Sequence, residues 1–301
     1  MTYSEIWHRI ATSYDDGEAR AIARILIEEL FGLSYADIVC GATDQLSADD
    51  TLRLDTAVRR IEQGEPLQHV LGYADFCGNR FSVNGSVLIP RPETEWLVDE
   101  GAKLMKGCIA SDETQHKAPH SPKRILDIGT GSGCIAISLK LRLGDAYVEA
   151  WDISEEALRT AQDNADALKA EVVFRKRDAL RADNTAAPWD LIVSNPPYIC
   201  DSERSAMDDN VLLHEPHTAL FVPDDDPLRF YRAIARYALL TLNIGGSLLF
   251  ECNTRYAEAT GTMLRDMGFE EVTVSDDCFN LPRFVRGRKN SPSQPSPSGR
   301  A

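Results

Sequence analysis

The segment Asn195-Pro196-Pro197-Tyr198 combines residue types that can bind and activate a planar nitrogen. Such a nitrogen is a poor nucleophile because its lone pair is delocalised. The Asn195 side-chain oxygen and the Pro196 carbonyl can accept its two N–H groups, and preorganised dipoles of this kind stabilise the charge that develops. Two prolines stiffen the turn, and Tyr198 can stack on a flat substrate group. We predict that all four residues bind substrate, that Asn195, Pro196 and Tyr198 are catalytic, and that no metal takes part; the alternative is a proline turn that merely ends a strand.

A glycine-rich segment upstream fits a bound nucleoside cofactor. It follows an apolar run, precedes a helical run from Cys134, and reads Asp127-Ile128-Gly129-Thr130-Gly131-Ser132-Gly133. Glycines let the backbone approach a ligand closely, at the sheet edge where parallel strands end. The dinucleotide fingerprint needs its third glycine one residue later, where Cys134 stands. The spacing therefore favours S-adenosylmethionine over a nicotinamide dinucleotide, bound by Gly129, Thr130, Gly131, Ser132 and Gly133.

Two further carboxylates follow predicted strands. Asp152 ends the second run, where a carboxylate can accept hydrogen bonds from both ribose hydroxyls, although nicotinamide enzymes use the same device. The preceding Trp151 fits either the adenine or the core. After the third run, Asp178 is placed to accept the adenine amino group, with Ala179 beside it, or else is a solvated loop residue. Asn195 is also a candidate for contact with the methionine end of the cofactor.

Three other positions keep alternative interpretations. His214 and His217 flank Glu215-Pro216, but their spacing is not helical and no third ligand is evident, so we predict no metal site. Glu251 follows a late apolar run and fits either a polar site lining or plain surface. Arg91 can pair with a cofactor carboxylate, with Glu93 or with Glu95.

Apolar runs and helical runs alternate over the second half of the chain. This alternation predicts an α/β fold with a doubly wound parallel sheet. The strand candidates are Ile125–Asp127, Val148–Trp151, Val172–Phe174, Leu191–Val193 and Ser247–Phe250.

Four segments are predicted along the chain. Residues 1–72 form a helical domain that docks the substrate, with one helix ending at Gly32 and another beginning at Ser47. Residues 73–104 are a hairpin connector, with Asn84-Gly85 as its turn and Thr94 as a helix cap. Residues 105–288 are the cofactor-binding domain, opening with a polar loop from Lys106 to Lys123. Residues 289–301, rich in serine and proline, are a disordered tail.

Composition narrows the class of partner. The net charge is −15, whereas domains that bind nucleic acid through its phosphates are usually basic. The seven cysteines are scattered and form no CxxC pair, which is typical of reduced thiols in a cytosol. The first residues lack a basic and then an apolar region, and no apolar run is long enough to span a membrane. We expect a cytoplasmic protein that binds neither nucleic acid nor membrane.

Asn195-Pro196-Pro197-Tyr198 resembles the motif of methyltransferases that act on planar nitrogens, including adenine and cytosine amino-methylases and protein glutamine N5-methyltransferases. The rest of the chain is similar to the bacterial release-factor glutamine methyltransferases. The matching segments are Gly64-Glu65-Pro66-Leu67-Gln68, Leu88-Ile89-Pro90-Arg91-Pro92-Glu93-Thr94-Glu95, Glu215-Pro216, Ala219-Leu220-Phe221 and Arg283-Phe284-Val285.

The resemblance implies a Rossmann-like class I methyltransferase fold, S-adenosylmethionine as cofactor, and a peptide chain release factor as partner. The methyl group would go to the side-chain nitrogen of the glutamine in its Gly-Gly-Gln sequence. An adenine amino-methyltransferase and methylation of a ribosomal-protein glutamine are the alternatives. Two departures stand out, since Ala179 replaces a frequent aromatic residue and Val222–Asp226 replaces a glycine-rich stretch.

Overall fold

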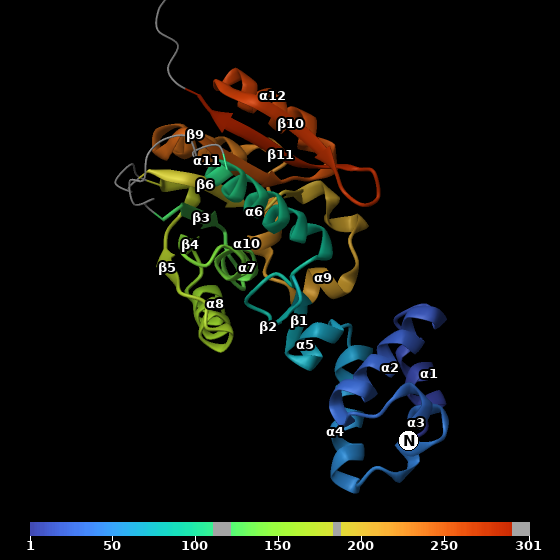
Figure 1. The fold of residues 1–301 in the computed structure, drawn as a ribbon. Helices are drawn as coiled ribbons and strands as arrows, with labels where there is room; N and C mark the ends of the chain where they lie inside the picture. The colour runs from blue at the N-terminus through green and yellow to red at the C-terminus, as the bar shows by residue number, and fades with distance from the viewer. Residues whose placement is uncertain (111–121, 183–187, 291–301) are drawn as a thin grey trace, which may run out of the picture.

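The computed structural model describes residues 1–110, 122–182 and 188–290. Figure 1 shows a small helical body at the N-terminus and a larger body built on a sheet, with a hairpin between them. The elements of the small body are α1 (Tyr3–Ile10), α2 (Asp16–Phe31), α3 (Tyr35–Val39), the 3-10 turn η1 (Ala42–Gln45), α4 (Ala48–Glu62) and α5 (Leu67–Leu71).

The helices of the small body begin and end at the residues that helix chemistry requires. The Ser47 hydroxyl accepts a hydrogen bond from Asp50 N at the start of α4, as predicted. Gly32 ends α2 with φ of 67°, a left-handed conformation that favours glycine. The apolar faces of α1, α2 and α4 meet in a core of their own, in which Ile10, Leu26 and Val58 are fully buried. The N-terminal body therefore does not depend on the sheet for its core.

The predicted hairpin exists, but its turn was placed wrongly. Strands β1 (Tyr73–Phe76) and β2 (Asn79–Ser82) pair antiparallel around Cys77-Gly78, which have φ of 49° and 75°. Positive φ at both central residues gives the primed turn that matches strand twist. Asn84-Gly85 instead follows the hairpin. The Asn84 side chain donates to Thr160 Oγ1 on a neighbouring helix, a tertiary contact that the local turn signal does not reveal.

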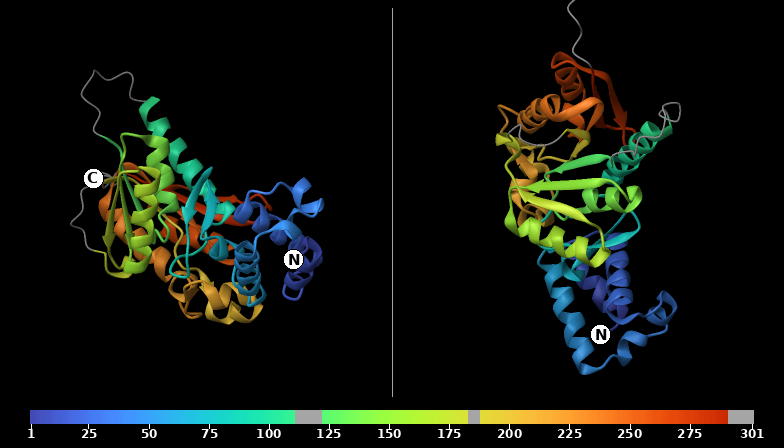
Figure 2. Two further views of the ribbon diagram at one scale, coloured as in Figure 1. Left: turned by 90° about the horizontal axis from the view of Figure 1, so that it is seen from below. Right: turned by 60° about the vertical axis from the view of Figure 1, so that its left-hand side comes forward.

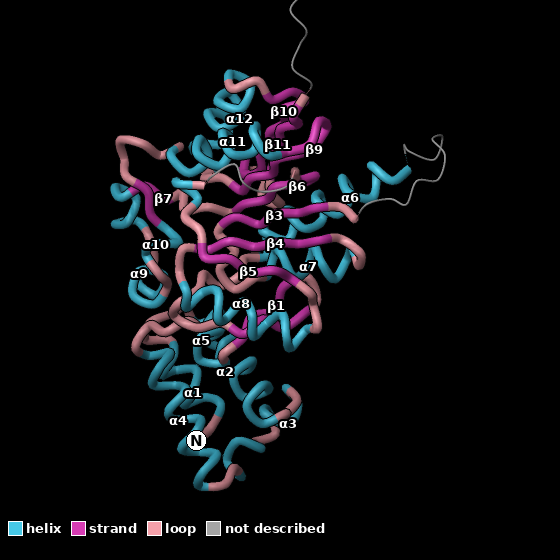
Figure 3. Tube along the Cα trace, turned by 90° about the vertical axis from the view of Figure 1, so that its left-hand side faces the viewer, coloured by secondary structure: helices cyan, strands magenta, loops and turns pink. Residues whose placement is uncertain are grey.

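The large body is built on a seven-stranded sheet in the order β10-β11-β9-β6-β3-β4-β5, seen edge to edge in Figure 3. Within this sheet, β3, β4, β5, β6 and β9 pair parallel, and β11 pairs antiparallel with β9 and β10. All five predicted strands lie in this sheet, and the doubly wound class is confirmed. The strands are β3 (Arg124–Ile128), β4 (Tyr147–Asp152), β5 (Val172–Lys176), β6 (Trp189–Ser194), β9 (Leu242–Glu251), β10 (Phe269–Asp276) and β11 (Pro282–Lys289).

Helices cover both faces of the sheet (Figure 2), because successive side chains of a strand point to opposite sides. Ile125 of β3 belongs to one core and its neighbour Leu126 to the other. Trp151 is buried in the second core, which decides between the two interpretations of this residue in favour of packing. The first face carries α6 (Glu95–Ala110), α7 (Cys134–Leu143) and α8 (Glu155–Leu168), and the second carries α11 (Arg229–Thr241) and α12 (Ala257–Asp266).

Shorter elements surround the ends of the strands. They are η2 (Pro92–Thr94), η3 (Ala179–Arg181), β7 (Ile199–Cys200), η4 (Asp201–Ala206), α9 (Asp209–His214), α10 (His217–Leu220), β8 (Phe221–Val222) and η5 (Thr254–Tyr256). Within the described ranges, no helix is long and apolar enough to cross a bilayer.

Two local predictions around α6 need correction. The polar stretch from Lys106 was predicted as a loop, but α6 continues to Ala110, and residues 111–121 lie outside the described residues. Thr94 does not cap a separate helix, because it ends η2, which runs directly into α6, and its hydroxyl donates to Glu251 instead. Of the predicted tail, Lys289 ends β11, and residues 291–301 lie outside the described residues.

One buried amide joins the hairpin to the glycine-rich segment. Asn164 of α8 accepts from Ser82 N at 2.7 Å and donates to the carbonyls of Ser82 and Ser132 at 3.0 and 2.9 Å. Its exposed fraction is 2%. Because all three partners are backbone groups, one side chain holds two segments that are far apart in sequence.

We expect Asn164→Ala to lower the free energy of unfolding by roughly 2–4 kcal/mol, because it leaves several buried backbone groups without partners. Urea unfolding followed by circular dichroism measures this change. Gln162→Ala, on the exposed side of the same helix, is the matched control and should shift stability by less than about 0.5 kcal/mol. Equal unfolding midpoints for both variants would contradict this account of Asn164.

Candidate functional site

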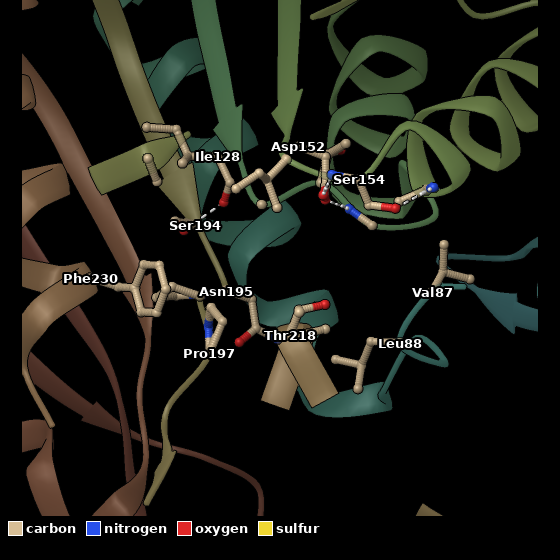
Figure 4. A pocket seen from close by; sticks show the side chains of 18 of the residues that line it. Val87, Leu88, Ile128, Asp152, Ser154, Ser194, Asn195, Pro197, Thr218 and Phe230 are labelled. Carbon is tan, nitrogen blue, oxygen red and sulfur yellow. Dashed lines mark hydrogen bonds between the residues drawn. The ribbon is translucent and has the colours of Figure 1, made fainter. Parts of the chain in front are cut away.

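A cavity of about 370 Å³ opens at the carboxyl ends of β3, β4, β5 and β6. Its wall combines the turns that follow these strands with residues 86–94 of the connector and parts of α10 and α11. In Figure 4, Asp152, Asn195 and Phe230 lie around the same open space, with Val87 and Leu88 across from them. Ligands of open α/β sheets bind at this edge, so the topology and the cavity indicate the same site.

The three glycines of the loop after β3 have different tasks. All three have positive φ, of 77° at Gly129, 53° at Gly131 and 81° at Gly133. A Cβ on Gly131 would meet no protein atom within 4 Å, and Gly131 lines the cavity. A Cβ on Gly133 would lie 2.9 Å from Ile137 and 3.1 Å from Ala161, and Gly133 is not in the cavity wall. Gly133 therefore allows α7 to pack against α8, whereas Gly131 keeps the cavity free of a side chain.

The glycine loop is fixed to the adjacent strand by its own backbone. Gly129 N and Thr130 N both donate to the Trp151 carbonyl at 2.9 Å. The Thr130 hydroxyl donates to Asp127 Oδ2 at 2.6 Å, beneath the loop. Asp127 is fully buried, and burial raises the pKa of its carboxyl to about 7. Thr130 and Ser132 line the cavity, as predicted residues of the loop, whereas Asp127 supports it from below.

Asp152 stands at the end of β4 with its carboxylate fixed by two backbone donors. Its Oδ2 accepts from Gly131 N and its Oδ1 from Ser154 N, each at 2.9 Å. Burial raises the pKa of this carboxyl. Asp152 lines the cavity, so the geometry brings it to the glycine loop as the sequence pattern predicted.

Asp178 and Ala179 line the cavity next to the end of β5. The Asp178 side chain accepts from Leu180 N at 2.8 Å and so begins the short turn η3. Its second oxygen lies 3.7 Å from Arg181 Nε. Asp178 therefore caps the turn η3, a role that the strand pattern did not predict. Its side chain still lies at the cavity wall while it does so.

The segment after β6 is only partly in the cavity wall. Asn195, Pro196 and Pro197 line it, and Asn195 Nδ2 lies 3.4 Å from Thr94 Oγ1. Tyr198 is not in the wall; its hydroxyl lies 3.4 Å from Glu251 Oε1, and burial raises its pKa. The structure thus brings three of the four predicted residues together at the cavity and directs the tyrosine hydroxyl behind them.

Arg91 has a partner that the sequence alternatives did not include. Its Nη2 lies 2.5 Å from Glu215 Oε1, and Glu215 Oε2 accepts from Ile89 N at 3.1 Å. The Glu215 side chain is 1% exposed, so the ion pair fixes the connector against the segment before α10. Glu95 instead accepts from Cys77 N at 2.7 Å.

Some residues of the cavity were missed from the sequence. Phe230 of α11 and Thr218 of α10 reach the wall from distant segments. A single aromatic residue in an amphipathic helix carries no signal of a binding role, so only the tertiary arrangement identifies it. Glu251 is 2% exposed, which excludes the surface interpretation.

The histidines near α10 lie apart from any metal-binding cluster. His217 Nε2 is 2.8 Å from the Leu212 carbonyl. Across residues 1–110, 122–182 and 188–290, no group of three or more histidine, cysteine, aspartate or glutamate side chains is arranged to hold a metal ion.

The two glycines offer a matched test of the loop. We expect Gly131→Val to abolish S-adenosylmethionine binding in isothermal calorimetry, because its side chain projects into the cavity. Both glycines have positive φ, so a valine at either position strains the backbone and lowers the melting temperature. Gly133→Val should lower the melting temperature further, through overpacking of α7 against α8. Unchanged cofactor binding by Gly131→Val would refute the placement of a ligand against this loop.

Two family models match the chain. The model described as the methyltransferase small domain matches residues 95–220, and the model described as the PrmC N-terminal domain matches residues 8–72. The chain is 43% identical over 277 residues to the release factor glutamine methyltransferase of Bacteroides thetaiotaomicron, covering 92% of this chain and 95% of that protein. It is 36% identical over 281 residues to the protein of the same name from Flavobacterium psychrophilum, covering 92% and 94%.

Solved structures share the fold at lower sequence identity. The hMettl16 catalytic domain, solved in complex with a 3′UTR hairpin, superposes with a TM-score of 0.52 at 18% identity, covering 83% of this chain and 85% of that one. This likeness supports the class of fold alone.

Proposed function

The chain belongs to the release factor glutamine methyltransferase family, and on this premise we propose that it methylates the side-chain amide nitrogen (N5) of the glutamine in the Gly-Gly-Gln sequence of a peptide chain release factor. One structural observation carries the proposal for the site. The Asn195-Pro196-Pro197 segment and the glycine loop line the same cavity, so a planar nitrogen and a nucleoside cofactor can meet there. The alternatives, adenine amino-methylation and methylation of a ribosomal-protein glutamine, are not favoured by these relatives.

Methyltransferases of this family use S-adenosylmethionine, whose sulfonium supplies an activated methyl group. The cavity fits such a cofactor, because its volume of about 370 Å³ lies within the usual range of ligand sites and a Cβ at Gly131 would point into open space. We assign the backbone of Gly129, Thr130, Gly131 and Ser132 to the cofactor, and the Asp152 carboxylate to its ribose hydroxyls. Asp178 and Ala179 are assigned to the adenine side. Gly133 acts indirectly, by allowing α7 to pack.

The substrate amide is held by the segment after β6. We assign the Asn195 Oδ1 atom and the Pro196 carbonyl as acceptors for its two N–H groups. Two acceptors in fixed positions turn the nitrogen lone pair toward the methyl group and stabilise the charge that develops on the nitrogen. Pro197 completes the wall, and Tyr198, predicted to stack on the substrate, is assigned to the support of this segment through Glu251.

We expect Asn195→Ala to lower turnover on the order of a hundredfold, because it removes one of two preorganised acceptors. The measurement is methylation of purified release factor with labelled S-adenosylmethionine, followed by mass spectrometry of the Gly-Gly-Gln peptide. Asn243→Ala is the matched control. Asn243 lies at the start of β9, at the edge of the sheet away from the cavity, and its side chain donates to Asp190. Wild-type enzyme that labels nucleic acid, or a ribosomal protein in place of release factor, would overturn the function, whereas full turnover in Asn195→Ala would discard only the role of Asn195.

We also propose that residues 1–72 dock the release factor, because one glutamine side chain cannot identify a protein. The match to the PrmC N-terminal domain and the separate core of these helices support this assignment. Tyr35 and Val39 are one turn apart on α3 and are 52% and 63% exposed, so they offer an apolar contact on one face.

The double variant Tyr35→Ala, Val39→Ser should reduce kcat/KM for intact release factor on the order of tenfold, as expected for loss of exposed apolar contacts. Methylation of a short Gly-Gly-Gln peptide should not change. Ile244→Ser removes an equally exposed apolar residue from the sheet body and should affect neither substrate. A wild-type kcat/KM of the double variant for intact release factor would show that α3 is not part of the docking surface.

The cellular location follows from the same proposal. The proposed substrate acts in translation, so we place the reaction in the cytoplasm.

A further inference from the structure

Three polar side chains from distant parts of the sequence meet at the cavity, which Thr94 and Asn195 line and behind which Glu251 is buried. Thr94 ends η2, Asn195 follows β6 and Glu251 ends β9. Thr94 and Glu251 are 3% and 2% exposed. Thr94 Oγ1 lies 2.7 Å from Glu251 Oε2 and 3.4 Å from Asn195 Nδ2. These contacts form a short hydrogen-bonded chain from the buried carboxylate to the residue at the cavity.

The chemistry of the chain fixes the direction of each hydrogen bond. An ionised carboxylate only accepts hydrogen bonds, so the single hydroxyl proton of Thr94 is donated to Glu251. The Thr94 oxygen is then left only with acceptor capacity toward Asn195. A side-chain amide has one donor end and one acceptor end, and its partners decide which end lies where. Asn195 must therefore give Nδ2 to Thr94, which leaves Oδ1 available to the substrate.

We propose that Thr94 and Glu251 are positioning residues that set the orientation of the Asn195 amide, and that the reaction requires Glu251 to act as a hydrogen-bond acceptor. This inference rests on the proposed function, because it concerns the acceptor offered to the substrate glutamine. The substrate nitrogen carries two N–H donors, so an Asn195 amide turned the other way would present donors to a donor.

Glu251 acts here through its negative charge, because a neutral side chain of the same size would not fix the direction of these hydrogen bonds. A neutral glutamine at position 251 can donate to Thr94, which frees the Thr94 proton for Asn195 Oδ1 and reverses the amide. Thr94→Val removes the acceptor altogether. Thr94→Ser keeps the hydroxyl and should keep the orientation.

The groups around Glu251 influence the pKa of its carboxyl. Thr94 and Glu93 face it from η2, Tyr198 from the segment after β6, and Arg283 from β11. Tyr198 donates toward the second carboxylate oxygen, Oε1, and Arg283 is itself held by Asp277, with Nε 2.7 Å from Oδ2. Burial is the main influence and raises the pKa of Glu251, while the Thr94 hydrogen bond and Arg283 oppose this rise.

The test compares Glu251→Gln, Thr94→Val and Thr94→Ser in the full-length enzyme with release factor as substrate. We expect the first two to lower kcat roughly tenfold to a hundredfold, as for partners that orient a reacting group, with the Kd for S-adenosylmethionine changed less than about twofold. Thr94→Ser should retain most of the wild-type kcat. Glu149→Gln and Thr241→Val are matched controls, because both replace buried, hydrogen-bonded residues away from the cavity.

A pH profile separates positioning from a structural role. Wild-type kcat should fall as pH decreases through the pKa of Glu251, because the protonated carboxyl can donate to Thr94. Glu251→Gln should lose the part of this acidic limb that belongs to Glu251 and stay slow at every pH at which the melting temperature shows a folded protein. Asp127 and Asp152, whose pKa values are also raised, are present in both proteins and serve as a common background. Wild-type kcat in Glu251→Gln, or a pH profile of this variant with the same shape as that of the wild type, would overturn the proposal. A wild-type enzyme that does not label the glutamine would instead overturn the proposed function.

Discussion

The register between β6 and its two parallel neighbours is the constraint on which the site depends. Ser194 pairs with Ile128 of β3 on one side and with Phe250 of β9 on the other. The Ser194 hydroxyl also donates to the Ile128 carbonyl at 2.6 Å, which fixes β6 to β3. A shift of one residue would turn every side chain of β6 to the opposite face. The register therefore places at one level the residues that follow these pairs, namely Gly129, Asn195 and Glu251.

The connector transmits this geometry to the rest of the chain. Its hairpin is bound to α8 and the glycine loop through Asn164, its middle to Glu215 through Ile89 and Arg91, and its end to Glu251. The same segment begins where α5 of the N-terminal body ends. If the release factor docks on the N-terminal helices as proposed, one continuous, anchored segment would position it relative to Asn195. In that proposal, the connector serves both substrate docking and orientation of the reacting nitrogen.

The sequence predicted what local pattern determines and missed what tertiary packing determines. The strand positions follow from the periodicity of apolar residues. The glycine loop and Asn195 follow from local motifs after two of these strands, and both line one cavity in the structure. The turn at Cys77-Gly78 did not follow, because Asn84-Gly85 carries the stronger local turn signal. The partner of Thr94 did not follow either, because Glu251 lies far away in the sequence. The role of Gly133 was also invisible in the motif, since only the packing of α7 on α8 distinguishes it from Gly131.

Two buried acids near the site lower the stability of the fold when they are ionised. Asp127 lies beneath the glycine loop and Glu251 beneath Asn195, and burial raises the pKa of both. An acid whose pKa is higher in the folded than in the unfolded state stabilises the fold fully only below its unfolded pKa. This contribution is lost as the pH rises through the folded-state pKa, which is about 7 for Asp127. Near neutral pH both groups thus oppose folding when they ionise. Neutral amides would relieve this opposition, but an amide at Glu251 could donate, and the direction of the hydrogen bonds to Asn195 would no longer be fixed. In the proposed mechanism, the reaction depends on the charge of Glu251 and the fold is stabilised by its loss, so stability and activity impose opposite demands on the same carboxyl.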